Sequence, residues 1–252
     1  MKNLFLVYFL SLAFINISFG QRHKASDFAN LGVEHNRLLD VAYQTIISKK
    51  ITNANKRDLI PVLQNALQDT EGYAMPDLEL GMQNLSNIGQ QSIAIDKNFY
   101  TFINSSKIDK LALPYHDKLF SIVMTENTSS KDLNSAVEKL ETEIFNDIRI
   151  DNENLLLFYS GSNVAKYSTK YWEDNLDNWI ALNPSNQSLA KNGRRRIVGA
   201  DVVGGIAGAV GAAIVNVLPG YGQVAYGSAI LAGAVGASIC EAGNQLMDWI
   251  GW

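Results

Sequence analysis

The chain has 252 residues, a formal net charge of -4 at pH 7 and a single cysteine. The acidic balance argues against general nucleic-acid binding, which requires a basic face to displace the counterions of the phosphates. A single cysteine excludes an intramolecular disulfide, so we expect a hydrophobic core to hold the fold together.

The first 20 residues have the pattern of a secretory signal peptide. One lysine precedes an apolar run over residues 4–15, and the small residues Ser18 and Gly20 follow it. The run is shorter than the roughly 20 residues that a membrane-spanning helix needs. We therefore expect cleavage after Gly20 and a periplasmic or extracellular protein that begins at Gln21.

The following segment, residues 21–181, carries apolar side chains at the three- and four-residue spacing of amphipathic helices, and alternating strand patterns are scarce. We predict an all-α body of about five helices. They cover residues 26–47, 58–67, 77–102, 129–148 and 155–180, and a further apolar segment over residues 111–122 contains Pro114. In the fourth helix the spacing predicts one core-facing side formed by Leu133, Val137, Leu140, Ile144 and Ile148.

Two sets of residues in the body are candidates for a metal, catalytic or ligand-binding site. His35 lies between Glu34 and Asn36, but adjacent helix positions point in different directions and the other two histidines lack ligand spacing. We therefore interpret His35 as a packed or hydrogen-bonded side chain. Tyr167 and Tyr171 share a helix face, and we interpret them as core anchors rather than a ligand platform.

Motifs that carry catalysis are missing from the sequence. It contains no P-loop, Rossmann glycine pattern, GxSxG, HExxH or paired-cysteine motif. We therefore predict a protein that is not an enzyme, with no catalytic residues, no metal site and no cofactor.

The C-terminal part of the chain differs in composition from the body. Residues 182–193 are rich in turn-forming residues, so we place a linker there. In residues 194–252, Gly, Ala and aliphatic residues replace most charges, and Asp201 is the only charged residue between positions 197 and 240. We predict a helical hairpin, whose turn is formed by Pro219, Gly220 and Gly222.

Both predicted arms of this hairpin carry small residues at every fourth position. Residues four apart share one helix face, and small residues allow two helix backbones to approach closely. The helix-packing stripes are Ala200, Gly204, Gly208 and Ala212 on the first arm and Ala225, Ala229, Gly233 and Ala237 on the second. We expect these stripes to contact each other, or a small-residue helix of another protein or of a second copy of this chain.

The glycine-rich runs at residues 204–211 and 233–236 resemble the glycine-zipper segments of membrane-active bacterial peptides and bacteriocin-like proteins. In the body, Glu34-His35-Asn36 and Tyr171-Trp172 resemble secreted bacterial helical proteins. The resemblance covers only short segments. It implies an exported helical body that carries a membrane-active hairpin.

The first arm, residues 197–218, would be about 33 Å long as a helix, which is sufficient for a bilayer core. Asp201 and Asn216 oppose burial in lipid, and export would leave the cluster Arg194, Arg195 and Arg196 on the translocated side of the membrane. These arginines are candidate contacts with a membrane surface.

Three interpretations of the hairpin therefore stay open. It remains in the exporting membrane, it packs in the core of a soluble secreted binding module, or it travels in soluble form and inserts into another membrane. We expect an exported, non-catalytic protein whose hairpin associates with a membrane or a partner helix. The alternative is the soluble binding module, whose function lies on the surface of the body.

Overall fold

The computed structural model describes residues 22–49, 108–126, 128–182 and 193–215, and within α9 it describes side chains as far as Ile206. Every regular element in these residues is helical, so the prediction of an all-α fold is confirmed. In chain order they are η1 (Ala25–Phe28), α2 (Ala29–Ser48), α6 (Leu113–Met124), α7 (Ser130–Asn146), α8 (Asn152–Ala181) and α9 (Gly193–Val215).

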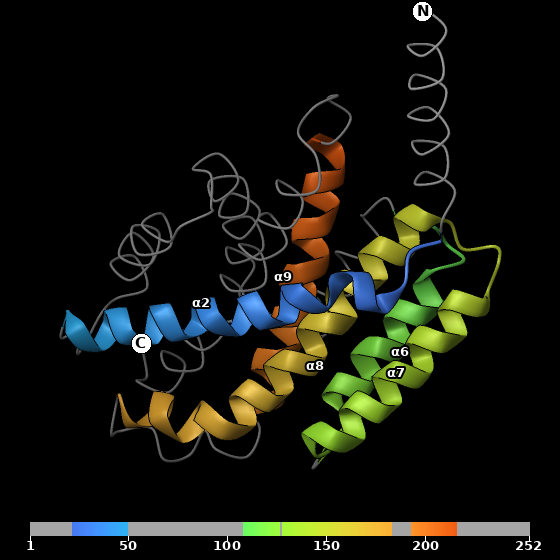
Figure 1. The fold of residues 1–252 in the computed structure, drawn as a ribbon. Helices are drawn as coiled ribbons and strands as arrows, with labels where there is room; N and C mark the ends of the chain where they lie inside the picture. The colour runs from blue at the N-terminus through green and yellow to red at the C-terminus, as the bar shows by residue number, and fades with distance from the viewer. Residues whose placement is uncertain (1–21, 50–107, 127, 183–192, 216–252) are drawn as a thin grey trace, which may run out of the picture.

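Helix α8 is the central element of the described fold. It packs against α2, α6, α7 and α9, with α6 and α7 side by side and with α2 and α9 crossing it (Figure 1). Every residue from Leu157 to Ala165 is buried. A helix that is buried on all faces in this way must be surrounded by other elements.

Helix starts follow from local capping chemistry. The Ser129 side chain accepts a hydrogen bond from the backbone N–H of Asp132 at the start of α7, and Asp151 caps α8 in the same way through the N–H of Asn154. These caps satisfy backbone donors that have no partner within the helix. Pro114 lies in the first turn of α6, where its missing N–H costs little, so it starts this helix rather than breaking it.

The end of α7 differs from the prediction. Leu133, Val137, Leu140 and Ile144 are buried as expected, but the helix ends at Asn146 and Ile148 is 89% exposed. Asp147 has an extended backbone conformation, which breaks the helical periodicity that would have placed Ile148 beside the other four. The prediction that Ile148 faces the core is therefore wrong. The helices predicted at residues 58–67 and 77–102 lie outside the described residues.

Helix α9 begins at Gly193, the last residue of the predicted linker. Five apolar side chains of α9 belong to the same hydrophobic core as those of α2, α6, α7 and α8. They are Ile197, Val198, Val202, Val203 and Ile206. The first half of the predicted first arm therefore packs against the body. The turn at Pro219, Gly220 and Gly222 and the second arm lie outside the described residues, as does the predicted signal peptide.

No helix within the described stretches combines the length and the apolar character that crossing a membrane requires.

Candidate functional site

The only charged residue in the predicted first arm is fully buried where α9 meets α8. Asp201 accepts hydrogen bonds on Oδ2 from the Ser168 hydroxyl and from Trp172 Nε1, the latter at 3.2 Å. Ser168 and Trp172 lie four residues apart on α8 and so present their donors on one face. Burying a carboxylate is costly unless it is hydrogen-bonded, and these two donors offset part of that cost.

Helix α2 contributes His35 to the same cluster. Its Nε2 atom lies 3.6 Å from Asp201 Oδ2, and both side chains are fully buried. On the other side of the ring, His35 Nδ1 lies 3.0 Å from Asn36 Oδ1, while Asn36 Nδ2 donates to the Tyr167 carbonyl at 3.1 Å. Because the amide nitrogen faces a carbonyl, the amide oxygen faces Nδ1, which must carry the proton of this hydrogen bond.

Burial is the main cause that lowers the pKa of His35 to about 4, and the hydrogen bond with Asn36 opposes it. The interpretation of His35 as a packed, hydrogen-bonded residue is confirmed. The cluster therefore joins α2, α8 and α9 through His35, Ser168, Trp172 and Asp201, and we call it the Asp201 junction.

A hydroxyl, a carboxylate and an imidazole also occur together in nucleophilic active sites. In those sites the hydroxyl is hydrogen-bonded to a base that removes its proton, and a substrate reaches it. In the Asp201 junction the Ser168 hydroxyl donates to the carboxylate, and Ser168, His35 and Asp201 are all fully buried. We therefore interpret the junction as an anchor between helices.

The predicted small-residue stripe is only partly within the described residues. Ala200 and Gly204 are buried; Gly208 and Ala212 lie on α9 beyond the described side chains. Ala225, Ala229, Gly233 and Ala237 lie outside the structure's described range.

Two other glycines lie at close contacts between α8 and α9. A Cβ atom on Gly161 would lie 2.8 Å from Ile206 Cγ1, and one on Gly205 would lie 3.3 Å from Val164 Cγ2. Sequence reasoning missed both, although the run Ser160-Gly161-Ser162 on α8 was a signal that a helix approaches there.

The first turn of α9 is fixed by two of the three arginines. Arg194 donates to the Thr128 carbonyl at 2.6 Å, and Arg195 donates at 3.1 Å to the carbonyl of Met124, the last residue of α6. Carbonyl groups at a helix C-terminus lack partners within the helix and carry partial negative charge. Arg195 also lies 3.2 Å from Glu126. Arg196 is half-buried. Contact of the three arginines with a membrane surface stays a prediction.

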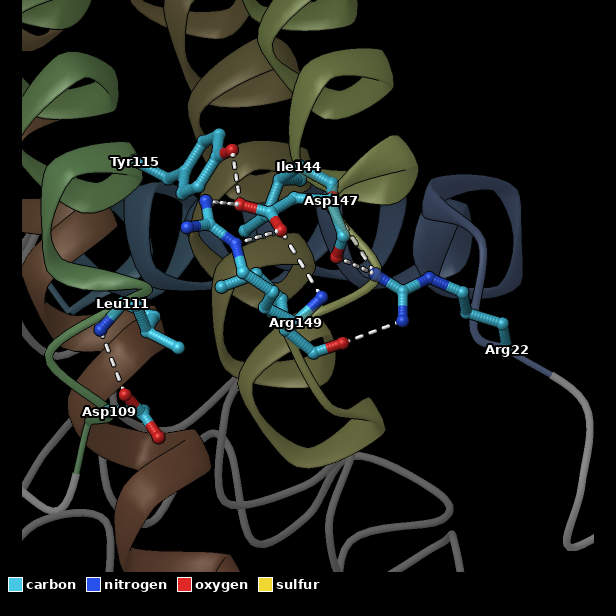
Figure 2. Close-up of polar contacts among 8 residues, drawn as sticks. Arg22, Asp109, Leu111, Tyr115, Ile144, Asp147 and Arg149 are labelled. Atoms are coloured by element: carbon cyan, nitrogen blue, oxygen red, sulfur yellow. Dashed lines mark hydrogen bonds and ion pairs between the residues drawn. The ribbon is translucent and has the colours of Figure 1, made fainter.

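An arginine near the N-terminus, Arg22, lies at the end of α7 (Figure 2). Its guanidinium donates to the carbonyl groups of Phe145 at 2.9 Å, Asp147 at 2.6 Å and Ile150 at 2.6 Å. Beside it, hydrogen bonds from Arg149 hold the pKa of the Asp147 carboxyl well below its usual range. Residues more than 120 positions apart are thus joined, which periodicity cannot predict.

Within the described residues, no group of three or more His, Cys, Asp or Glu side chains is arranged to hold a metal ion. Comparisons with protein-family models, with curated proteins and with solved structures find no match for this chain.

Proposed function

We propose that this chain is an exported, non-catalytic helical protein that holds the start of a Gly/Ala-rich segment in its core and uses that segment to associate with a membrane. The observation that carries the proposal is the Asp201 junction. It places a single hydrogen-bonded carboxylate in the least charged part of the sequence.

The carboxylate has opposite effects in the two environments of the segment. In a lipid-embedded helix an aspartate opposes insertion, by about 2.5 to 3.5 kcal/mol at the centre and by less towards the end of the span, where Asp201 lies in the predicted first arm. In the fold, Ser168 and Trp172 donate to Asp201, and His35 lies beside it. Asp201 therefore favours the state in which α9 is packed on α8, which suits a segment that must stay in a water-soluble carrier until it reaches its target.

The composition beyond Asp201 supports association with lipid or with another helix. After Ile206, α9 continues to Val215 with only Gly, Ala, Val and Ile. Small residues at regular spacing allow helices to pack closely in a membrane, where van der Waals contact replaces the hydrophobic effect as the driving force. The export step is inferred from the signal-peptide pattern of residues 1–20.

A secreted binding module without membrane activity is the second candidate. The continuity of the hydrophobic core favours it, because the apolar residues of α9 from Ile197 to Ile206 pack with those of the body. In that case the Asp201 junction is a packing contact, and the binding surface lies elsewhere.

Co-sedimentation with vesicles distinguishes the two candidates. The mature chain from Gln21 and the Asp201→Ala variant are incubated with phosphatidylethanolamine–phosphatidylglycerol vesicles and with buffer alone. If α9 is a held membrane segment, loosening the junction increases the vesicle-bound fraction. If α9 only packs the core, Asp201→Ala lowers stability and the variant sediments equally with and without vesicles, which would reject the membrane proposal.

A further inference from the structure

A second histidine, outside the Asp201 junction, is buried without a hydrogen bond. His116 lies on α6 and is fully buried, and among the described residues neither ring nitrogen has a hydrogen-bond partner. The ring makes an edge-on contact with Phe158 of α8, with the centroids 5.5 Å apart. A neutral imidazole is tolerated in such a place at some cost, whereas an imidazolium there would be a buried charge without a counterion.

His116 lies one helical turn from the point where α6, α8 and α9 meet. Leu119 follows it by three residues on α6, and Gly161 follows Phe158 by three residues on α8. A Cβ on Gly161 would lie 2.8 Å from Ile206 of α9 and 3.5 Å from Leu119 of α6. If α6 and α8 separate at His116 and Phe158, the packing of Ile206 against α8, one helical turn away, is therefore expected to loosen.

Within the described residues no charged side chain is hydrogen-bonded to His116. On α6 itself, burial raises the pKa of Asp117. The ion pairs on α6 and on the elements packed against it are Lys118 with Glu143, Lys166 with Glu141, Lys170 with Asp174, Arg149 with Asp147, Arg194 with Glu173 and Arg195 with Glu126. Asp201 faces α8 and His35.

We propose that His116 is a proton sensor: its protonation at mildly acidic pH separates α6 from α8 and breaks the packing of Ile206 of α9 against α8. Burial without a compensating hydrogen bond lowers the pKa of His116 to about 4 from its ordinary 6.5. Burial lowers the pKa of His35 to about 4 as well, but Nδ1 of its ring is hydrogen-bonded to Asn36 and Nε2 lies 3.6 Å from the Asp201 carboxylate, so its protonated form would have a counterion. His35 is present in both the parent and the His116 variant, so the difference between these two proteins isolates His116.

The direction of the pH effect follows from proton binding. Because the pKa is lower in the folded state, the unfolded or opened state binds more protons between pH 6.5 and pH 4. The contribution of the neutral His116 to the free energy of unfolding is therefore fully present above pH 6.5, and it is lost as the pH falls towards 4. From pH 7 to pH 5, His116 alone raises the opening equilibrium constant about 20-fold.

Urea unfolding at pH 7 and pH 5 tests the sensor in the mature chain from Gln21. His116→Phe keeps an aromatic ring but cannot be protonated, and His23→Gln is the matched control, since His23 is half-buried and packs against Phe28. The measured quantity is the factor by which the unfolding equilibrium constant rises from pH 7 to pH 5. We expect this factor to be about 20-fold smaller in His116→Phe than in the parent, and to be the same in His23→Gln as in the parent.

An equal pH dependence of the parent and His116→Phe would overturn the proposal. If the phenylalanine variant does not fold, the NMR titration of the His116 ring in the parent decides. An apparent pKa near 6.5 in the folded protein would contradict the sensor, and one well below it would support the sensor.

Hydrogen exchange at pH 5, corrected for the intrinsic rate, locates the opening. We expect faster exchange in α6 and in residues 193–206 of α9 than in α7, and uniform exchange across all helices would overturn the local release of α9.

If the sensor releases α9, membrane binding should increase at acidic pH, and this expectation rests on the proposed function. Vesicle binding measured at pH 7 and pH 5 separates the sensor from the membrane function. Vesicle binding at pH 5 that His116→Phe abolishes would support both. Local opening at pH 5 without vesicle binding would reject the membrane function and retain the sensor. Vesicle binding at pH 7 and pH 5 alike, without opening, would reject the sensor and retain the membrane function.

Discussion

Gly161 of α8 and Ile206 of α9 lie so close that a Cβ atom on the glycine would be 2.8 Å from Ile206 Cγ1. Real Cβ atoms do not approach other carbon atoms this closely, so a side chain at position 161 forces Ile206 to move. The close packing of the two helices therefore depends on the absence of one methyl group.

Gly161→Ala is expected to destabilise the protein. Alanine improves helix propensity by about 1 kcal/mol, but overpacking of a tight interface typically costs about 1 to 3 kcal/mol, so we expect a net loss. Gly205→Ala is the matched control, because its Cβ would lie 3.3 Å from Val164 and require a smaller shift. Urea unfolding compares the two. Greater damage from Gly205→Ala than from Gly161→Ala would contradict this packing.

The partner of Gly161 can be tested with a second change. Ile206→Ala removes Cγ1 and Cδ1, which would lie 2.8 Å and 3.0 Å from the new Cβ. We expect the double variant Gly161→Ala/Ile206→Ala to be more stable than the sum of the two single changes predicts, because the methyl group gains room. Strict additivity in a double-mutant cycle would show that the clash lies elsewhere.

Asp201→Ala is expected to cost about 3 kcal/mol of unfolding free energy, because it leaves the buried Ser168 hydroxyl and Trp172 indole without their acceptor. Asp201→Asn keeps an acceptor oxygen of similar size and is expected to cost less. Chemical denaturation at pH 7 measures both. Equal stability of the alanine and asparagine variants would show that the hydrogen bonds to Oδ2 do not hold α9.

Arg22→Ala is expected to lower stability by about 2 kcal/mol, because a half-buried guanidinium donates to several carbonyl groups where α7 ends. Arg22→Lys restores only part of the loss, since an ammonium group lacks the planar array of donors. Arg149→Ala is the control: the Arg149 side chain is 66% exposed, and we expect a smaller loss than for Arg22→Ala. Thermal unfolding of the three variants gives the comparison. A Tm loss for Arg149→Ala as large as that for Arg22→Ala would contradict the role of Arg22.

The sequence predicts those parts of the fold that local rules determine. Ser129 marks the start of α7, and the buried side of that helix follows from Leu133 to Ile144 at helical spacing. The same rule fails at Ile148, because the helix ends two residues earlier and periodicity has no meaning beyond its end. Arg22 could not be predicted, since its partners are brought near only by the tertiary fold.

The small-residue pattern was informative about the kind of contact but not about its exact position. Four-residue spacing selects Ala200 and Gly204, whereas the described contact with Val164 uses Gly205, the next position. The stripe is predicted to contact the second arm or a small-residue helix of another chain, and the prediction does not consider packing against α8. Against α8, the facing side of α9 is determined by where Asp201 meets Ser168 and Trp172.

Gly208→Leu tests the predicted stripe beyond the described side chains. Leucine favours a helix over glycine by nearly 1 kcal/mol, but it adds several carbon atoms to a stripe whose function requires close approach. We expect lower thermal stability or lost vesicle binding, and no effect from Val210→Leu on a different face. A Gly208→Leu protein equal to the parent in both properties would refute the zipper interpretation.

The most direct test uses the single cysteine, Cys240, which lies in the Gly/Ala-rich segment and gives one unambiguous labelling position. The mature protein is labelled under denaturing conditions with an environment-sensitive fluorophore, refolded and mixed with phosphatidylethanolamine–phosphatidylglycerol vesicles. We predict that the emission shifts to the blue and is quenched by nitroxides on the lipid chains, more strongly in Asp201→Ala than in the parent. Emission that vesicles leave unchanged in both proteins would contradict the claim that this segment enters a membrane.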